Sequence, residues 1–182
     1  MDMDTHPGKV FRFCPFCGSA DFHWDGTKSY ICSACNRKLY TNEAGATVAL
    51  IKNENGDLLF TTRKFDPQKG KLDLPGGFID LGETAENGVC REVKEELNLN
   101  VTKLHFFGTF PNTYSYGGLT YFTIDIVFEC EVESLSPLQA NDDVARVQFL
   151  NPNTINLDDI GLDSIKNVVK ALRQKKHCFP QK

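Results

Sequence analysis

The distribution of apolar and polar positions divides the chain into two segments of different character. From about Phe11 to Tyr40 the chain has paired cysteines and few aliphatic residues. Its core would be too small to fold without an additional stabilising link. From Ala44 onward, apolar runs of strand length alternate with stretches of helical periodicity, the pattern of an α/β domain. We therefore expect a small module over residues 1–40 and a larger domain over residues 41–182.

Apolar runs predict the strands of the larger domain. They cover Ala46–Lys52, Leu58–Thr62, Leu104–Phe110, Leu119–Val132 and Val144–Leu150. Asn55-Gly56 is a strong hairpin signal between the first two runs. Pro111-Asn112 together with Gly117-Gly118 indicates a turn between the third and the fourth. A hairpin is thus expected to open the domain, with a second strand pair later in the chain.

Two helices are predicted from periodicity and capping residues. Thr84 is a plausible N-cap, the helical pattern continues to Leu97, and Asn98 tolerates the left-handed conformation that ends a helix. A final amphipathic helix follows from apolar residues at spacing i, i+3, i+4 and i+7, which are Ile165, Val168, Val169 and Leu172.

The first of these helices carries three carboxylates on one arc. At 100° per residue, Glu92, Glu95 and Glu96 lie together, beside the small residues Ala85 and Gly88. Each like-charged pair at these spacings costs roughly 0.2–0.5 kcal/mol. A solvated acidic face would explain the pattern, but the glycine-rich turn before the helix favours a cation. With no histidine or thiolate nearby, oxygen ligands suit Mg²⁺ or Mn²⁺.

Four cysteines in two tight pairs indicate a second metal site. Cys14, Cys17, Cys32 and Cys35 have the pattern of two zinc knuckles separated by a short hairpin. Four thiolates would close the coordination shell of a structural Zn²⁺. A rubredoxin-like iron site and a redox dithiol are the alternatives. The aromatic residues Phe22, Trp24 and Tyr30 are expected to pack this hairpin.

Composition and charge restrict the partners. The chain has 182 residues, 41% of them hydrophobic, and a formal net charge of -4. No run approaches the roughly 18 apolar residues that span a bilayer, and Met1–Lys9 lacks the apolar stretch of a signal peptide. We expect a cytoplasmic protein with a small-molecule substrate, for which nucleic acid and membrane are poor partners. The oligomeric state stays open, a homodimer included.

The segment Gly77–Leu99 resembles the Nudix box of the Nudix hydrolase superfamily. Gly77, five residues, Glu83, seven residues, Arg91-Glu92-Val93, one residue, Glu95-Glu96, one residue and Asn98-Leu99 carry the match. Asn98 departs from the glycine that is usual there. The resemblance covers about Thr41 to Lys176 and implies an αβα sandwich with mixed sheets, and hydrolysis of a nucleoside diphosphate linked to another moiety.

The resemblance also implies roles for single residues. It makes Glu92, Glu95 and Glu96 the metal ligands, and Glu83 with Arg91 the pair that braces loop and helix. The nucleophile would be water. Its proton would pass to a helix glutamate or to a later acid, Asp142 or Asp143, although an acidic pair is also an ordinary turn.

The substrate groups are expected around the glycine-rich turn and the second strand pair. Gly76 and Gly77 would bring backbone close to metal and phosphate. Aromatic residues after the box, Tyr114, Tyr116 and Tyr121, can stack a nucleobase or simply pack a hairpin. Arg63 would bind a phosphate, or it would simply lie on an exposed edge of a sheet.

A four-cysteine ribbon before a Nudix domain looks like the arrangement in NADH pyrophosphatases and in some FAD or ADP-ribose pyrophosphatases. The SQPWPFPxS string that marks the NADH enzymes is replaced here by Gly108–Gly118. We therefore expect a broader ADP-ribose or dinucleotide pyrophosphatase. A house-cleaning nucleoside triphosphate pyrophosphohydrolase and a non-catalytic regulator that senses nucleotide sugars are the alternatives.

Overall fold

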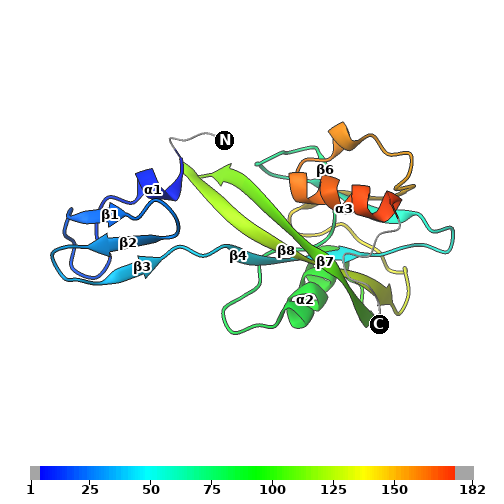
Figure 1. Cartoon of the computed structure of the whole chain (residues 1–182). Helices are drawn as coiled ribbons and strands as arrows, with labels where there is room; N and C mark the ends of the chain where they lie inside the picture. Colours follow the sequence, from blue (N-terminus) through cyan, green and yellow to red (C-terminus); the bar gives the residue numbers. More distant parts are fainter. Residues whose placement is uncertain (1–4, 175–182) are drawn as a thin grey trace. The chain divides into compact units, whose positions relative to one another are not determined.

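The computed structural model describes residues 5–174. Its strands are β1 (Phe22–Trp24), β2 (Ser29–Cys32), β3 (Lys38–Tyr40), β4 (Ala44–Leu50), β5 (Leu58–Arg63), β6 (Leu72–Asp73), β7 (Val101–Tyr116), β8 (Leu119–Val132) and β9 (Val144–Leu150) (Figure 1). Its helices are α1 (Pro7–Val10), α2 (Ala85–Leu97), the 3₁₀ helix η1 (Leu157–Asp159) and α3 (Asp163–Arg173).

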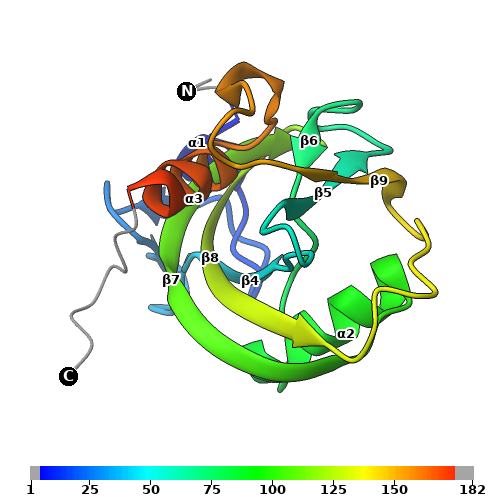
Figure 2. The same ribbon diagram turned by 90° about the vertical axis from the view of Figure 1, so that its right-hand side faces the viewer.

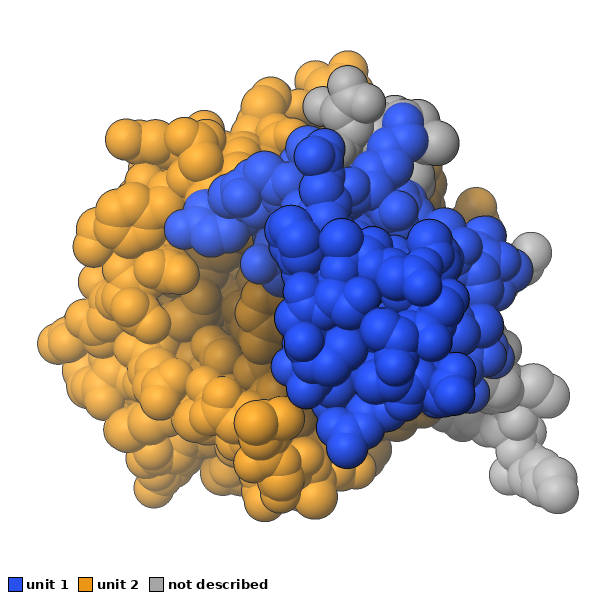
Figure 3. Space-filling model, turned by 90° about the vertical axis from the view of Figure 1, so that its left-hand side faces the viewer, with its two compact units in different colours: residues 1–43, 113–122 blue, residues 44–112, 123–182 orange. Residues whose placement is uncertain are grey.

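The chain forms two compact units, coloured separately in Figure 3. The first combines Met1–Glu43 with Thr113–Phe122, and the second combines Ala44–Asn112 with Thr123–Lys182. The first unit thus contains the tip of the β7–β8 hairpin as well as the cysteine-rich segment. A domain boundary near residue 41 remains our proposal.

The first unit is built on the antiparallel sheet β1-β2-β3. Its small core consists of Cys14, Cys32 and aromatic rings, with Phe22 stacked on Tyr30 at 4.5 Å between centroids and Trp24 tilted against Tyr30. The expected aromatic packing is therefore present. The hairpin tip joins this unit through Thr120, whose N–H donates to the carbonyl of Thr5 at 2.7 Å.

The second unit has two three-stranded sheets between two helices. One sheet has the order β4-β8-β7, with β4 parallel to β8, and the other has the antiparallel order β6-β5-β9. Helices α2 and α3 lie on opposite sides of these sheets (Figure 2). The layers confirm the predicted Nudix-type αβα sandwich, an α+β fold with a mixed sheet.

Alternate residues of β4 face the two different cores. Val48 and Leu50 belong to the cluster that includes Ile165 and Val168 of α3. Ala49, by contrast, belongs to the cluster that includes the buried face of α2. Since successive strand residues point to opposite faces, this sheet is covered on both sides, which accounts for the nearly continuous apolar run in the sequence.

The predicted opening hairpin is only partly correct. The turn is present, with Gly56 at φ 80° and its N–H donating to the carbonyl of Asn53 at 3.0 Å. Beyond the bridge between Lys52 and Leu58, however, β4 pairs with β8 and β5 pairs with β6 and β9. The two strands separate into different sheets because each finds its main partner far along the chain.

The predicted turn at Pro111-Asn112 is wrong. Strand β7 continues through both residues to Tyr116, and the chain turns only at Gly117-Gly118. Proline is tolerated more readily here because β7 is an edge strand of its sheet, where alternate N–H positions face away from β8 and make no ladder bond.

Both predicted helices are confirmed, including the buried residues Ile165, Val168 and Val169 of α3. Within residues 5–174, no helix has the length and apolar character needed to cross a membrane.

Candidate active site

Helix α2 is fixed at both ends by its capping residues. The Thr84 hydroxyl accepts from the Asn87 N–H at 3.2 Å, and Asn98 takes the left-handed conformation at φ 56°. The helix buries Val89, Val93 and Leu97 completely. This apolar anchor turns the arc of glutamates toward the chain segment that precedes the helix.

Arg91 ties that segment to the helix. Its guanidinium donates to both carboxylate oxygens of Glu83, from Nε at 3.0 Å and from Nη2 at 2.9 Å, and Nη2 also donates to the Phe78 carbonyl. Nη1 reaches Glu92 at 2.7 Å and Glu95 at 3.0 Å. The resemblance implied that Glu83 and Arg91 brace the loop against the helix, and the structure has a bidentate ion pair between these two residues.

Gly76 and Gly77 allow the backbone to approach the glutamates. Gly76 has φ 143°, and a Cβ there would lie 2.0 Å from the Thr47 carbonyl oxygen. Its N–H donates to Glu96 Oε2 at 3.0 Å. A Cβ on Gly77 would lie 2.6 Å from Glu92 Oε1. Both positions therefore exclude larger residues, and they hold two of the three glutamates against the turn.

Further acids surround Glu96. Its carboxyl is buried, with 8% of the residue exposed, and burial raises its pKa to about 8. The Gly76 N–H opposes this shift of the pKa, whereas Glu92, Asp73 and Asp143 add to it by repulsion.

Glu92 has a raised pKa for related reasons. Burial is the largest cause, Arg91 opposes it, and Glu95 and Asp142 add repulsion. The acidic pair Asp142-Asp143 therefore lies close enough to α2 to act on both Glu92 and Glu96.

This donor set fits a hard divalent cation such as Mg²⁺ or Mn²⁺. All its ligands are carboxylate oxygens, and the buried acids repel one another, so bound positive charge would stabilise their ionised forms. Within the part of the chain that the structure describes, these oxygens do not converge as tightly as the four cysteine sulfurs do. Mg²⁺ does not require such a cage, because it keeps several waters and shares its shell with substrate phosphates.

The other predicted substrate residues are spread over both units. Arg63, on β5, is paired with the buried Asp73 at 2.6 Å and donates from Nε to the Pro67 carbonyl at 2.7 Å. Tyr114 and Tyr121 stack at 5.7 Å in the hairpin tip, where Tyr116 is exposed. The tyrosines thus belong to the first unit, whereas Arg63, the glycines and the glutamates belong to the second.

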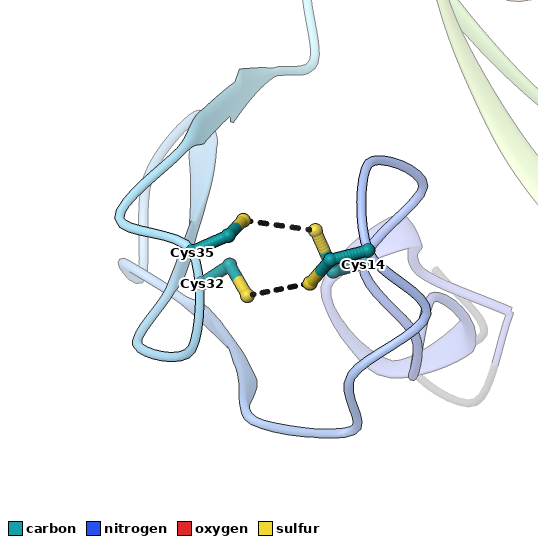
Figure 4. A group of neighbouring side chains, drawn as sticks. Cys14, Cys32 and Cys35 are labelled. Carbon is teal, nitrogen blue, oxygen red and sulfur yellow. Dashed lines mark hydrogen bonds between the residues drawn. The ribbon is translucent and has the colours of Figure 1, made fainter.

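The four cysteines come together in the first unit (Figure 4). Their Sγ atoms all lie within 4.8 Å of one another, with 3.8 Å between Cys14 and Cys35 and 3.6 Å between Cys17 and Cys32. These separations exclude disulfides. Tetrahedral Zn²⁺ with bonds of about 2.3 Å sets its sulfurs about 3.8 Å apart, so the cluster fits a zinc ribbon.

Comparison with known proteins agrees with this geometry. A family model described as a NUDIX domain matches residues 42–172, more than half of the chain. The chain belongs to the Nudix family. The resemblance of Gly77–Leu99 to the Nudix box is thereby confirmed.

The chain is similar in sequence to two curated proteins. It is 34% identical over 140 residues to an ADP-ribose pyrophosphatase of Methanocaldococcus jannaschii, covering 76% of this chain and 78% of that protein. It is 30% identical over 149 residues to the NAD-capped RNA hydrolase NudC of Pseudomonas syringae pv. syringae, covering 74% of this chain and 53% of that one. The chain therefore spans about half the length of this NudC relative.

Solved Nudix structures share the fold. A Nudix hydrolase from Nitrosomonas europaea superposes with a TM-score of 0.67 at 22% identity, covering 92% of this chain and 93% of that one. The Nudix domain of Shewanella oneidensis NrtR, complexed with ADP ribose, superposes with a TM-score of 0.57 at 18% identity, covering 75% of this chain and 90% of that one.

Asp73 is the residue at this Nudix site that the sequence did not reveal. It directly follows Leu72 in a short strand, pairs with Arg63 and repels Glu96. Its buried position depends on the pairing of β6 with β5 across a loop, which no local pattern signals.

Proposed function

We propose that the chain hydrolyses the diphosphate linkage of a nucleoside diphosphate derivative of the ADP-ribose, NADH or FAD type, with Mg²⁺ or Mn²⁺ bound by Glu92, Glu95 and Glu96. Family membership together with the named relatives supports a Nudix-type pyrophosphohydrolase that acts on a nucleotide derivative. The observation that carries the proposal is the mutually repelling pair of half-buried Glu92 and buried Glu96, held against Gly76 and Gly77.

The residues of this site divide the work between positioning and proton transfer. The Gly76 N–H holds the Glu96 carboxylate, and Arg91 fixes the loop through Glu83. Asp143 supplies a carboxylate that can accept the proton of the attacking water. A bound divalent cation supplies charge neutralisation at the diphosphate oxygens and a lower pKa for coordinated water.

The substrate class is supported by the relatives. One is named an ADP-ribose pyrophosphatase and others NAD-capped RNA hydrolases, so a nucleoside diphosphate core is common to their substrates. Stacking of a base on Tyr114, Tyr116 and Tyr121, which belong to the first unit, stays a prediction from the sequence. Arg63 and the N–H groups of the glycine turn contact phosphate.

The remaining assignments concern the molecule as a whole. We propose structural Zn²⁺ at Cys14, Cys17, Cys32 and Cys35, on the sulfur separations given above. A cytoplasmic location, a domain boundary near residue 41 and a possible homodimer complete the proposal.

A substrate panel tests the activity. Purified protein is incubated with ADP-ribose, NADH, FAD and nucleoside triphosphates, with and without Mg²⁺, and products are separated by chromatography. Mg²⁺-dependent release of AMP from at least one diphosphate derivative is expected. Turnover of triphosphates alone would indicate the house-cleaning enzyme. Binding of ADP-ribose without any turnover would indicate the regulator and contradict the enzymatic proposal.

A further inference from the structure

A cavity of about 490 Å³ lies on the β6-β5-β9 sheet of the second unit. It is lined by Thr62, Lys69, Gly70, Lys71, Leu72, Arg146, Gln148 and Asp159. No residue of the glutamate cluster or of the glycine turn contributes to this lining. Its volume is within the range of pockets that hold small molecules, roughly 300–1,000 Å³.

The cavity lies on the sheet face that points away from α2. Thr62 pairs with Arg146 across β5 and β9, and Phe60 pairs with Gln148, so these four side chains share one face. Phe60 packs in the cluster formed with α3, whereas its neighbour Leu59 packs in the cluster formed with α2. The cavity is thus separated from the α2 glutamates by the sheet itself.

Hydrogen bonds fix the rim of the cavity. Lys71 Nζ donates to the Asp158 carbonyl at 2.9 Å, and the Gly161 N–H donates to the Leu72 carbonyl at 3.0 Å. The Gly70 N–H donates to the Arg63 carbonyl at 2.9 Å. These bonds join the β5–β6 loop to the η1 segment, so two walls of the cavity are held together without a ligand.

The lining carries an excess of positive charge. It contains Lys69, Lys71 and Arg146 against the single acid Asp159, in a chain whose formal net charge is -4. Between residues 5 and 174, neither Lys69 nor Arg146 has an ion-pair partner. An anion in the cavity would relieve the repulsion among these cations, and Thr62 and Gln148 add neutral hydrogen-bond donors.

We propose that this cavity is a second ligand site, which binds a phosphate-bearing small molecule of about nucleotide size. Guanidinium and ammonium groups are the side chains that bind phosphate oxygens best. The glutamate site repels phosphate unless a divalent cation is present, whereas the cavity attracts it directly. Binding at the second site therefore needs no Mg²⁺, and this inference stands whether or not the proposed hydrolysis is correct.

Calorimetric titration of the full chain with ADP in magnesium-free buffer tests the site. Saturable binding is expected, and the double variant Lys71→Ala/Arg146→Ala should weaken it at least about tenfold while its Mg²⁺-dependent activity stays unchanged. The matched control Lys103→Ala/Lys166→Ala removes the same charge from positions that pair elsewhere, with Glu131 and Asp163, and should keep the wild-type affinity. The exposed loop variant Lys69→Ala serves as a second test if the double variant does not fold.

The outcomes separate this site from the active site. Glu92→Gln/Glu96→Gln should bind ADP without Mg²⁺ as the wild type does. Absence of magnesium-free binding would overturn the proposal, as would an affinity that neither cavity variant changes. If the control Lys103→Ala/Lys166→Ala weakened ADP binding equally, the binding would come from general charge attraction, and this result would also overturn the proposal.

Discussion

Among single residues, Glu96 links the electrostatics of the site to the stability of the fold. Burial raises its pKa from 4.5 to about 8, so the folded chain holds a proton on Glu96 where the unfolded chain has lost it. The stabilising contribution is complete below pH 4.5 and is lost as the pH rises toward 8. At higher pH the ionised Glu96 carboxylate destabilises the folded chain, and a bound cation would offset that cost.

The first prediction concerns this pH dependence. In magnesium-free buffer, the free energy of unfolding of the wild type should fall between about pH 4.5 and pH 8, with Glu96 contributing at least about 1 kcal/mol. Glu96→Gln should flatten the profile because the amide does not titrate. Urea unfolding at a series of pH values measures both. Parallel profiles for the two proteins would contradict the assigned environment of Glu96.

Gly77→Ala tests the close approach of the turn to the helix. The new Cβ would lie 2.6 Å from Glu92 Oε1 and must displace that carboxylate. We expect Mg²⁺-dependent turnover to fall at least about tenfold, since misplaced ligands lose transition-state stabilisation. Circular dichroism should show an intact fold. Full activity would mean that the position of Glu92 is not critical.

The sequence predicted residues whose partners are close along the chain. Glu83 and Arg91 are eight positions apart, across one turn and the start of one helix, and their ion pair forms as expected. Arg63 and Asp73 are nearly as close in number, but their contact depends on β5 pairing with β6. The charges alone gave no sign that Asp73 would be buried beside Glu96.

At the scale of elements, helix α2 was predictable to its ends. Its N-cap, its apolar arc and its left-handed final residue are local properties, and all three appear in the structure. Of the strands β4 to β9, the sequence predicted all except the two-residue β6, but it did not predict how β4 and β5 pair. Strand β4 pairs with β8, more than 70 residues later, and no turn signal near Asn55-Gly56 specifies that choice.

Asn98→Gly tests the end of this helix. Asn98 has φ 56°, a conformation in which glycine avoids the Cβ penalty. We expect Asn98→Gly to raise the free energy of unfolding by about 0.5 kcal/mol and Asn98→Ala to lower it by about 1 kcal/mol. Thermal unfolding of the three proteins gives the order. Equal stability of the Gly and Ala variants would contradict the left-handed cap.

At the scale of the whole molecule, the cysteine cluster determines whether the first unit can fold. Its core consists of Cys14, Cys32 and a few aromatic rings, and it is too small to be stable without a further link. The second unit has two larger clusters and does not share this dependence.

Cys32→Ser should therefore affect one unit. Loss of one thiolate should release the metal and unfold the ribbon, because four-cysteine sites couple binding to folding. Elemental analysis of the wild type should give about one zinc per chain, and the variant should give none. Hydrogen-exchange mass spectrometry should show that backbone amides lose protection in β1, β2 and β3 but not in α2. Wild-type protein without tightly bound zinc or iron would refute the ribbon assignment.

The central claim is that the α2 glutamates carry metal-dependent hydrolysis. The most direct measurement is the rate of AMP release by wild type and Glu96→Gln at saturating Mg²⁺, on the best substrate of the panel. The account predicts a loss of at least about 10²-fold in kcat, with a melting temperature no lower than that of the wild type. Wild-type turnover by Glu96→Gln would contradict the account.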